Sequence, residues 1–570
     1  MPRPRGRFAL LLLVATASRA AQIQVPAGGS FQAGLAAASP GDTVCVQAGT
    51  YLEQVTLVPG VALLGGWDAG FTSRDPDANV SMIHGAGVRS CIVSGSGADT
   101  ATVVDGFTLR GAGGSPGAAI RVTGGSPVFS HNDVSENRLA GIAGGAYVSG
   151  GSTARFSDNE FRENSTGGSG GAFRIEGSSP VIERNVLTGN VARNSGGGFY
   201  VFQSTLACTD NTIRGGLAGN GGGGAFSFQE CPAGGVVTGT VIEDCAAGHG
   251  GAIHLRDESA VTFVNTVIKR CSATAASGGF GGGVFVLGFS SIDMSSARFE
   301  DCSATADGGG VWSFQSTLKL TGPDATSASS PAAFSGCSAL GRGGGIWAFA
   351  TDDTTQNQIK GVRFSDCSAR DEGGGFYFEE CDFLFAKNLL ERCSASQGGG
   401  GAVRTALSVG PPITVVVNNT FYACSSTLDP STNPGAGLAV LGPNSPNAPT
   451  FLAGNIIAGT LSGACIGCPG GTQPRIDCST FHNDAANPSN VSGGCPFQDG
   501  TNGNAARDPG FCDPNPVDYS LKDCALELNC PEAEDITGST LRGVTDVTCP
   551  CAISAIEESS WGLIKSRYRR

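Results

Sequence analysis

Adjacent carboxylates are the side chains in this sequence best suited to acid–base catalysis, because two carboxyl groups held together can serve as acid and base. The candidates considered are the adjacent pairs Asp352/Asp353, Asp371/Glu372 and Glu379/Glu380. Neighbouring residues on a strand point to opposite faces, so a pair converges only in a loop. We therefore interpret these pairs as solvated surface and predict no catalytic residue.

Two other groups of residues have types that could carry chemistry. His249 and His254 flank a GGAI segment, and each is more typical of a surface or turn position than of a base. Cys465 and Cys468 have CxxC spacing, and Cys478 and Cys495 follow them. In an exported, cysteine-rich segment this spacing favours a disulfide framework over a zinc site. We predict no metal-ligating residues and no cofactor; calcium is an open alternative that no sequence motif supports.

A glycine cluster followed by an apolar, often aromatic run recurs ten times, and this repeat must position any site. The last glycines of successive clusters lie 26, 27, 26, 27, 32, 27, 35, 30 and 26 residues apart. A fixed period of this length predicts a solenoid, in which each repeat buries its apolar face against its neighbours. The clusters begin at Gly144, Gly170, Gly196, Gly221, Gly250, Gly281, Gly308, Gly343, Gly373 and Gly398.

The apolar runs alternate with period two, which predicts one face inside the solenoid and one outside. We expect the large second and fourth residues after each cluster to face the core, as in Tyr200/Phe202, Phe226/Phe228, Ile253/Leu255, Phe285/Leu287, Trp312/Phe314 and Trp347/Phe349. The variable third residues, such as Ser227 and His254, would face outward. Stacked coils would then form internal aromatic ladders. A sugar-binding aromatic stripe is the alternative.

A second repeated element places an apolar residue three positions before Asn or Cys. The residue is Asn in early repeats (Asn137, Asn164 and Asn190) and Cys in later ones (Cys245, Cys271, Cys302, Cys337, Cys367, Cys393 and Cys424). We expect the asparagines to stack and hydrogen-bond from coil to coil. The cysteines would be buried, either as disulfides between neighbouring coils or as apolar thiols, since the expected coil spacing suits a disulfide. Metal binding by stacked thiols is a third alternative.

Two stretches resemble known proteins. Residues 30–67, SFQAGLAAASPGDTVCVQAGTYLEQVTLVPGVALLGGW, resemble the opening of exported right-handed parallel β-helix proteins of the pectate-lyase-like class, in which a short helix caps the first coil. The paired Asn and glycine elements resemble the repeats of chlamydial-type polymorphic outer-membrane proteins, although here Asn gives way to Cys. The expected fold is therefore all-β, a right-handed parallel β-helix of 14 to 16 coils with an N-terminal capping helix and a Cys-rich C-terminal segment.

The chain divides into five predicted parts by composition. Residues 1–20, with arginines before a short apolar run, have the pattern of a signal peptide. The others are a cap with the first coils (21–100), the repeat body (101–460), a closing segment with nine cysteines (461–551) and a tail that could be a sorting signal (552–570).

Charge and cysteine content restrict the function. The net charge is −14, and an acidic chain without basic clusters argues against nucleic acid. The 21 cysteines agree with export, and no apolar run in the mature chain is long enough to span a membrane. We expect a secreted or cell-surface protein, and the resemblances imply a Gram-negative bacterium.

The predicted function is a non-catalytic scaffold, adhesin-like or glycan-binding. Its expected partner is an extracellular polysaccharide, or the surface of a host or neighbouring cell. The alternative is a polysaccharide lyase or glycoside hydrolase that acts on an extended glycan in a groove of the β-helix. The fold alone does not separate the two.

Overall fold

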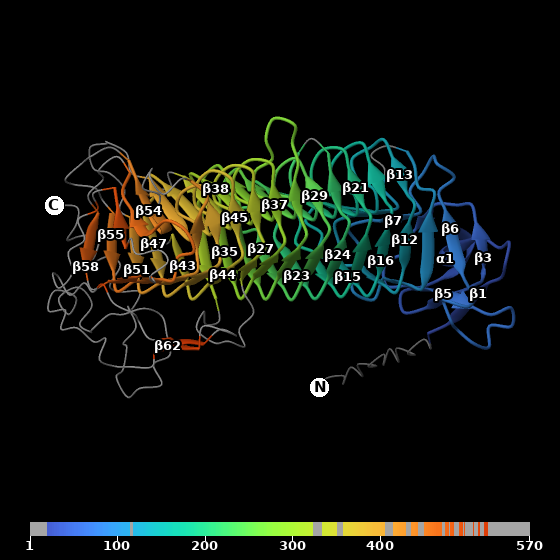
Figure 1. The fold of residues 1–570 in the computed structure, drawn as a ribbon. Coiled ribbons are helices and arrows are strands. Elements are labelled where there is room, and N and C mark those ends of the chain that lie inside the picture. Colours follow the sequence, from blue (N-terminus) through green and yellow to red (C-terminus); the bar gives the residue numbers. More distant parts are fainter. Residues whose placement is uncertain are drawn as a thin grey trace, which may run out of the picture.

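The computed structural model shows a long parallel β-solenoid with one short helix at its N-terminal end (Figure 1). Within the described part of the chain, no helix is long and apolar enough to cross a membrane. The described residues are 20–114, 118–219, 221–322, 333–349, 357–404, 414–428, 435–442, 450–469, 474–477, 479–483, 490–493, 495, 506, 511–513 and 518–521.

One complete coil contains four short strands, each belonging to a different parallel sheet. In the coil of residues 199–218 these are β22 (Phe199–Phe202) in sheet C, β23 (Leu206–Thr209) in sheet A, β24 (Thr212–Arg214) in sheet B and β25 (Leu217–Ala218) in sheet D. The right-handed parallel β-helix expected from the sequence is confirmed.

The four sheets run along most of the stack. Sheet A has 17 strands, from β1 (Gln22–Val25) to β58 (Arg475–Asp477), and sheets B and C have 16 each. Sheet B runs from β3 (Gly49–Tyr51) to β59 (Thr480–His482), sheet C from β4 (Val55–Thr56) to β60 (Val491–Ser492), and the 11-stranded sheet D from β13 (Arg138–Leu139) to β53 (Ser425–Ser426). With one strand per coil in each sheet, the 16 strands of sheets B and C agree with the predicted 14 to 16 coils. A separate antiparallel pair joins β61 (Phe511–Asp513) and β62 (Asp518–Leu521).

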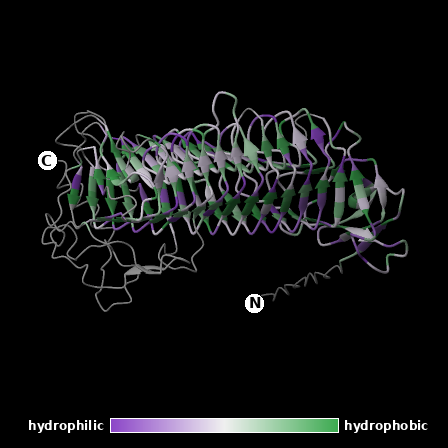
Figure 2. Cartoon of the chain, viewed as in Figure 1, coloured by the Kyte–Doolittle hydropathy of each residue, from purple (hydrophilic) through white to green (hydrophobic). Residues whose placement is uncertain are grey.

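Neighbouring coils pair in register, so equivalent side chains stack along the axis. Phe199 of β22 lies between Phe173 of β18 (Phe173–Glu176) and Phe226 of β26 (Phe226–Gln229), with ring centroids 4.9 and 4.8 Å apart. Side chains of this kind form one continuous apolar core. Figure 2 shows hydrophobic residues in strands along the whole length of the stack.

The predicted capping helix is α1 (Phe31–Ala37). It begins at Ser30, whose side chain accepts a hydrogen bond from the Ala33 amide at 3.2 Å, as N-cap serines do. Phe31 and Leu35 are four residues apart and both buried, with the Phe31 ring 4.5 Å from that of Tyr51. The helix therefore covers the apolar end of the first coil.

The predicted inward face of the apolar runs is wrong for several coils. Tyr200, Phe285, Trp312 and Trp347, each the second residue after its cluster, lie on the outer face of sheet C. The residues in register with the internal Phe226 are instead Phe199, Ile253, Val284, Val311 and Ile346. In the coils of Phe226 and Ile253, an alanine (Ala225 or Ala252) takes the place of the last glycine of the cluster. The second residue after the last glycine therefore faces the core in these two coils, but faces outward in the coils of Tyr200, Phe285, Trp312 and Trp347.

Candidate functional site: a polar groove across successive coils

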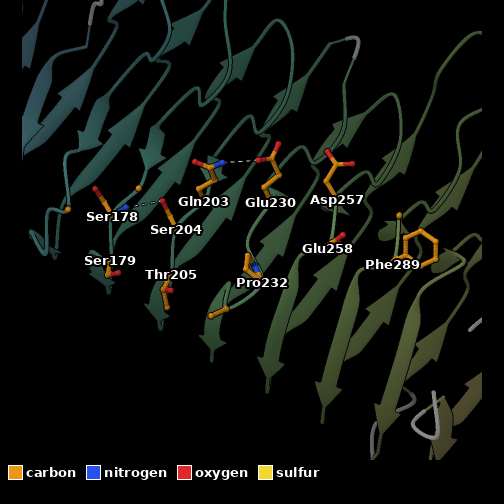
Figure 3. Close-up of a pocket in the computed structure, with 14 residues that line it drawn as sticks. Ser178, Ser179, Gln203, Ser204, Thr205, Glu230, Pro232, Asp257, Glu258 and Phe289 are labelled. Carbon is orange, nitrogen blue, oxygen red and sulfur yellow. Dashed lines mark hydrogen bonds between the residues drawn. The ribbon is translucent and has the colours of Figure 1, made fainter. Parts of the chain in front are cut away.

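A groove of about 1100 Å³ crosses the turns that follow the strands of sheet C (Figure 3). Six successive coils contribute to its walls, so its length is about 24 Å at ordinary strand spacing. The polar and aromatic side chains that line it are Ser178, Ser179, Gln203, Ser204, Thr205, Glu230, Asp257, Glu258 and Phe289.

The turns bring these side chains into rows because each turn leaves its strand in the same way. Gln203, Glu230 and Asp257 follow β22, β26 and β30 (Ile253–Arg256), and all three have left-handed backbone with φ of 48°, 52° and 56°. Backbone hydrogen bonds join the turns, as from Gln203 N to the Gln229 carbonyl at 3.2 Å. Figure 3 shows the three side chains side by side along the axis.

The left-handed backbone of these three residues does not by itself indicate a functional site. Non-glycine residues adopt it in other turns too, including His131, Asp158 and Arg184 between sheets A and B. Such conformations can store strain at active sites. In this protein they recur with the coil, and therefore belong to the fold.

The chemistry of the groove is that of hydroxyls and carboxylates. Glu230, Asp257 and Glu258 are exposed, and Gln203 Nε2 donates to Glu230 Oε2 at 2.8 Å, which holds the Glu230 carboxylate in place. Ser179 and Thr205 present exposed hydroxyls on the same wall. None of the described lining residues is lysine or arginine. The groove can accept hydrogen bonds from a polyhydroxylated ligand, and its carboxylates, of which Asp257 lies 3.7 Å from Arg256, disfavour an anionic one.

Phe289 closes one end of the groove and is unusual among the aromatic residues. Its side chain is 64% exposed, although it follows β34 (Val284–Leu287) in a tight turn. Among the described residues no other ring packs against it. The ring is therefore largely open to a ligand, whereas burial of a phenylalanine is normally favourable.

Sequence reasoning missed these groove residues. Their turns have the period of the glycine clusters, but the residue types change from coil to coil. The signal that could have found them is the first residue after each sheet C strand, which is Gly177, Gln203, Glu230, Asp257 and Gly288 in successive coils.

The outward aromatic residues of sheet C form a ladder whose ring faces are occupied. Phe285 stacks on Trp312 of β38 (Val311–Phe314) at 4.4 Å, and Trp312 stacks on Trp347 of β42 (Ile346–Phe349) at 5.0 Å. In the next coil, the guanidinium of Arg342 lies 5.2 Å from the centre of the Tyr377 ring. The ladder therefore presents ring edges outward, which is poor geometry for stacking a sugar on a ring face.

Beside this ladder, carboxylates from two of the predicted acidic pairs converge. Arg342 Nε lies 2.9 Å from Glu372 and Arg342 Nη1 lies 3.4 Å from Glu379, while Arg404 contacts the same two carboxylates at 3.4 and 3.9 Å. Tyr377, on β46 (Phe376–Glu379), donates its hydroxyl to Glu379 at 3.0 Å and is fully buried. Burial raises the pKa of the Tyr377 phenol. Glu372 precedes β46 and Glu379 ends it, so both carboxylates belong to one coil, and the two arginines reach them from the coils on either side.

The other acidic residues of those pairs do not join this cluster. Asp371 lies 3.2 Å from the neighbouring Arg370, and Glu380 occupies a left-handed turn. Asp352 and Asp353 lie outside the described residues.

The predicted asparagines occupy one internal turn. Asn137 Nδ2 donates to Asn164 Oδ1 at 2.9 Å, and Asn164 Nδ2 donates to Asn190 Oδ1 at 3.0 Å, with all three side chains buried. A second row, missed in the sequence, fills the turn between sheets A and B with the same geometry: Asn132, Asn159, Asn185 and Asn211, resumed later by Asn388, Asn419 and Asn455. Its spacing of 26 or 27 residues in the early coils was a visible signal.

The seven predicted cysteines stack in the later coils and are here called the Cys ladder: Cys245, Cys271, Cys302, Cys337, Cys367, Cys393 and Cys424. Each is fully buried and carries a free thiol. The Cys271 thiol donates to the Lys269 carbonyl at 3.3 Å, and burial raises its pKa. The Cys271 carbonyl accepts a hydrogen bond from the Ser303 amide at 3.0 Å, which fixes the coil spacing beside the thiols.

The two histidines belong to the outer aromatic cluster. His254 lies 4.9 Å from Phe285, and His249 lies 5.2 Å from the same ring. Burial lowers the pKa of His254 to about 3, and it also lowers the pKa of His249. His254 lies on β30 and faces outward from sheet C as expected, but Phe285 and its neighbours cover it, so that it is only 8% exposed.

The CxxC spacing does not create a site. Cys468 forms a disulfide with Cys495, whereas Cys465 is a buried free thiol hydrogen-bonded to the Ile457 carbonyl at 3.3 Å. Cys478 lies outside the described residues, as does most of the Cys-rich segment. Within the described ranges, no cluster of three or more His, Cys, Asp or Glu residues is suited to a metal ion.

Comparison with known proteins agrees with the geometry of the stack. Residues 78–231, from the start of the regular coils through β26, match a family model described as a right-handed beta helix region. The fold and this match define a right-handed β-helix repeat protein. A search of curated proteins found no match.

Proposed function

We propose that this protein is an exported or cell-surface scaffold that binds an extended glycan in the groove without cleaving it. The observation that carries the proposal is Phe289, a largely exposed ring at the end of a groove lined by hydroxyls and carboxylates. Sugar-binding sites combine an aromatic face for the apolar side of a sugar ring with polar groups for its hydroxyls. The length of the groove, about 24 Å, suits a chain of several sugar units.

The negative charge of the groove determines which glycans it can bind. Three carboxylates line the groove, and the described lining contains no basic side chain. A polymer rich in uronic acid or sulfate would be repelled, whereas neutral sugars and sugars with free amino groups would be accommodated. The signal-peptide pattern of residues 1–20 and the resemblance to polymorphic outer-membrane repeats support export and display at the cell surface.

Glycan binding can be tested with purified protein on an array of neutral, amino and acidic oligosaccharides, followed by calorimetric titration. We expect binding of neutral or amino glycans, and a loss of about tenfold in affinity for Phe289→Ala. Leu52→Ala is the matched control, because Leu52 is 65% exposed but lies near the N-terminal cap. Equal loss in both variants, or preferential binding of acidic glycans, would contradict the proposal.

One observation favours a catalytic alternative, a polysaccharide lyase or glycoside hydrolase. Glu372 precedes β46 and Glu379 ends it in one coil, and both contact the Arg342 guanidinium on the outer face of sheet C. Both carboxylates are ion-paired with arginine, however, and Tyr377 beside them is fully buried. Product assays for reducing ends and for unsaturated sugars separate the two functions. Release of product that Glu379→Gln abolishes would establish the enzyme.

A further inference from the structure

The Cys ladder replaces the strongest internal hydrogen-bonding element of the early coils with a weaker one. Asn190 ends the Asn row, and Cys245 begins the thiol row in the same repeat position after one coil with glycine. Thiols donate weak hydrogen bonds, so the substitution removes polar bonding from that turn. Thiols can instead do something that amides cannot, which is to cross-link.

The geometry of the ladder is suited to cross-linking between neighbouring coils. Consecutive ladder residues lie in adjacent, hydrogen-bonded coils, since the amides of Ser338, Ser368 and Ser394 donate to the carbonyls of Cys302, Cys337 and Cys367, each at 2.9 Å. In-register coils place equivalent Cα atoms about 4.8 Å apart, within the range that a disulfide spans.

The same chain already contains one cross-link of this kind. Cys468 follows β57 (Ala464–Gly467), Cys495 follows β60, and these strands pair in adjacent coils. The two cysteines are 27 residues apart, about one coil, and their Cα atoms are 5.1 Å apart. The spacing of coils in this protein therefore accommodates a disulfide between them.

We propose that the Cys ladder is a modification site in which neighbouring thiols oxidise in pairs to disulfides that staple adjacent coils. The oxidant is a low-molecular-mass disulfide. One cysteine thiolate attacks it to form a mixed disulfide and release one thiol. The neighbouring cysteine then displaces the second thiol. Each staple thus takes two protons and two electrons from the protein and reduces one small disulfide to two thiols.

Burial determines when this modification happens. All seven thiols are fully buried, and reaction requires the thiolate, which burial disfavours for Cys271 and Cys424. Oxidation therefore belongs to folding in an oxidising compartment, before the coils close. A chain folded under reducing conditions keeps its thiols.

If only neighbouring thiols pair, the number of disulfides depends on whether each uninterrupted run of cysteines has an even or an odd number of members. A row of seven thiols yields at most three disulfides and one thiol. Cys302→Ala leaves runs of two and four, so three disulfides form with no ladder thiol left. Cys271→Ala isolates Cys245 and leaves a run of five, so at most two disulfides form and two ladder thiols remain. Both variants remove one fully buried thiol, and only their place in the row differs.

The experiment uses the full chain, refolded with reduced and oxidised glutathione or with reductant alone. Free thiols are then alkylated in denaturant, and linked peptides are mapped by mass spectrometry. Far-UV circular dichroism verifies that each variant has folded, and the Cys468–Cys495 link reports that oxidation worked. Cys208→Ala, a fully buried cysteine outside the row, should behave as the wild type.

We expect links only between consecutive ladder cysteines in the oxidised samples, with three in Cys302→Ala and two in Cys271→Ala. Two results would overturn the proposal. One is full alkylation of the ladder in oxidised samples that contain the Cys468–Cys495 link. The other is linkage between cysteines that are not neighbours in the row.

Discussion

Asn132 and Asn159 occupy the same place in adjacent coils, and Asn132 Nδ2 donates a hydrogen bond to Asn159 Oδ1 at 3.0 Å. The same oxygen also accepts from the Asn132 backbone amide at 3.0 Å. Asn159 Nδ2 in turn donates to the Phe129 carbonyl and to Asn185 Oδ1 at 3.0 and 2.9 Å. A single buried side chain thus satisfies polar groups in three consecutive coils.

Replacement of a residue in the middle of this row should be costly. Asn159→Ala leaves the buried Asn132 donors and the Phe129 carbonyl without this partner, and we expect a loss of about 3 kcal/mol in the free energy of unfolding. Denaturant titration followed by circular dichroism measures it. Asn194→Ala, at an exposed position, is the control and should change stability by less than about 0.5 kcal/mol.

Sequence reasoning succeeded where every coil repeats one residue type. The glycine clusters and the row of Asn137, Asn164 and Asn190 predicted the solenoid, because stacking demands the same residue at the same place in each coil. It wrongly placed Trp312 and Trp347 in the core, because which residue faces inward depends on whether glycine or alanine precedes the strand. It also failed on the groove. Residues such as Glu230 and Phe289 come together only through stacking, and no short segment of sequence contains the site.

Close approach between coils makes some glycines irreplaceable. A Cβ on Gly309 would lie 2.2 Å from the Gly344 carbonyl oxygen and 2.4 Å from that of Ser338, and both belong to the backbone of the next coil. We expect Gly309→Ala to destabilise the fold by roughly 3 kcal/mol, because the coils must separate.

The matched control for this prediction is Gly87→Ala. Gly87 has a φ of +73° but no neighbour within 4 Å of an added Cβ, so its cost should be only about 1 kcal/mol. Thermal unfolding of both variants makes the comparison. Equal losses would show that backbone conformation, and not close approach, determines the glycines of this fold.

The buried His254 should make the protein sensitive to acid. Its pKa is about 3 in the fold and about 6.5 in an unfolded chain, so the unfolded state binds the proton first as the pH falls. The contribution of the neutral ring to stability is complete above pH 6.5. It declines by about 1.4 kcal/mol for each pH unit down to about pH 3.

His254→Phe should remove this part of the pH dependence, since phenylalanine does not titrate and can stack on Phe285. Melting temperatures measured between pH 7 and pH 4 provide the comparison with the wild type. If both proteins lose stability in parallel over that range, His254 does not cause the acid sensitivity.

The carboxylates of the groove should discriminate between sugars by charge. Glu230→Gln preserves shape and removes one negative charge, so affinity for an amino glycan should fall about fivefold, the effect of roughly 1 kcal/mol. Affinity for the matching N-acetylated glycan should change less than twofold. Calorimetric titration at low and high salt measures both ligands, and salt should weaken only the first.

In-register stacking determines how the length of the solenoid, and of its groove, can change. Residue for residue, each coil faces its equivalent in the next, as Phe199 faces Phe226 and Gln203 precedes Glu230 in the groove. A duplicated coil would therefore fit between its parents without any shift of pairing, and it would lengthen the groove by about 4.8 Å. Under the proposed function, the number of sugar units that the groove accommodates would follow the number of coils, which unequal recombination within a single gene can change.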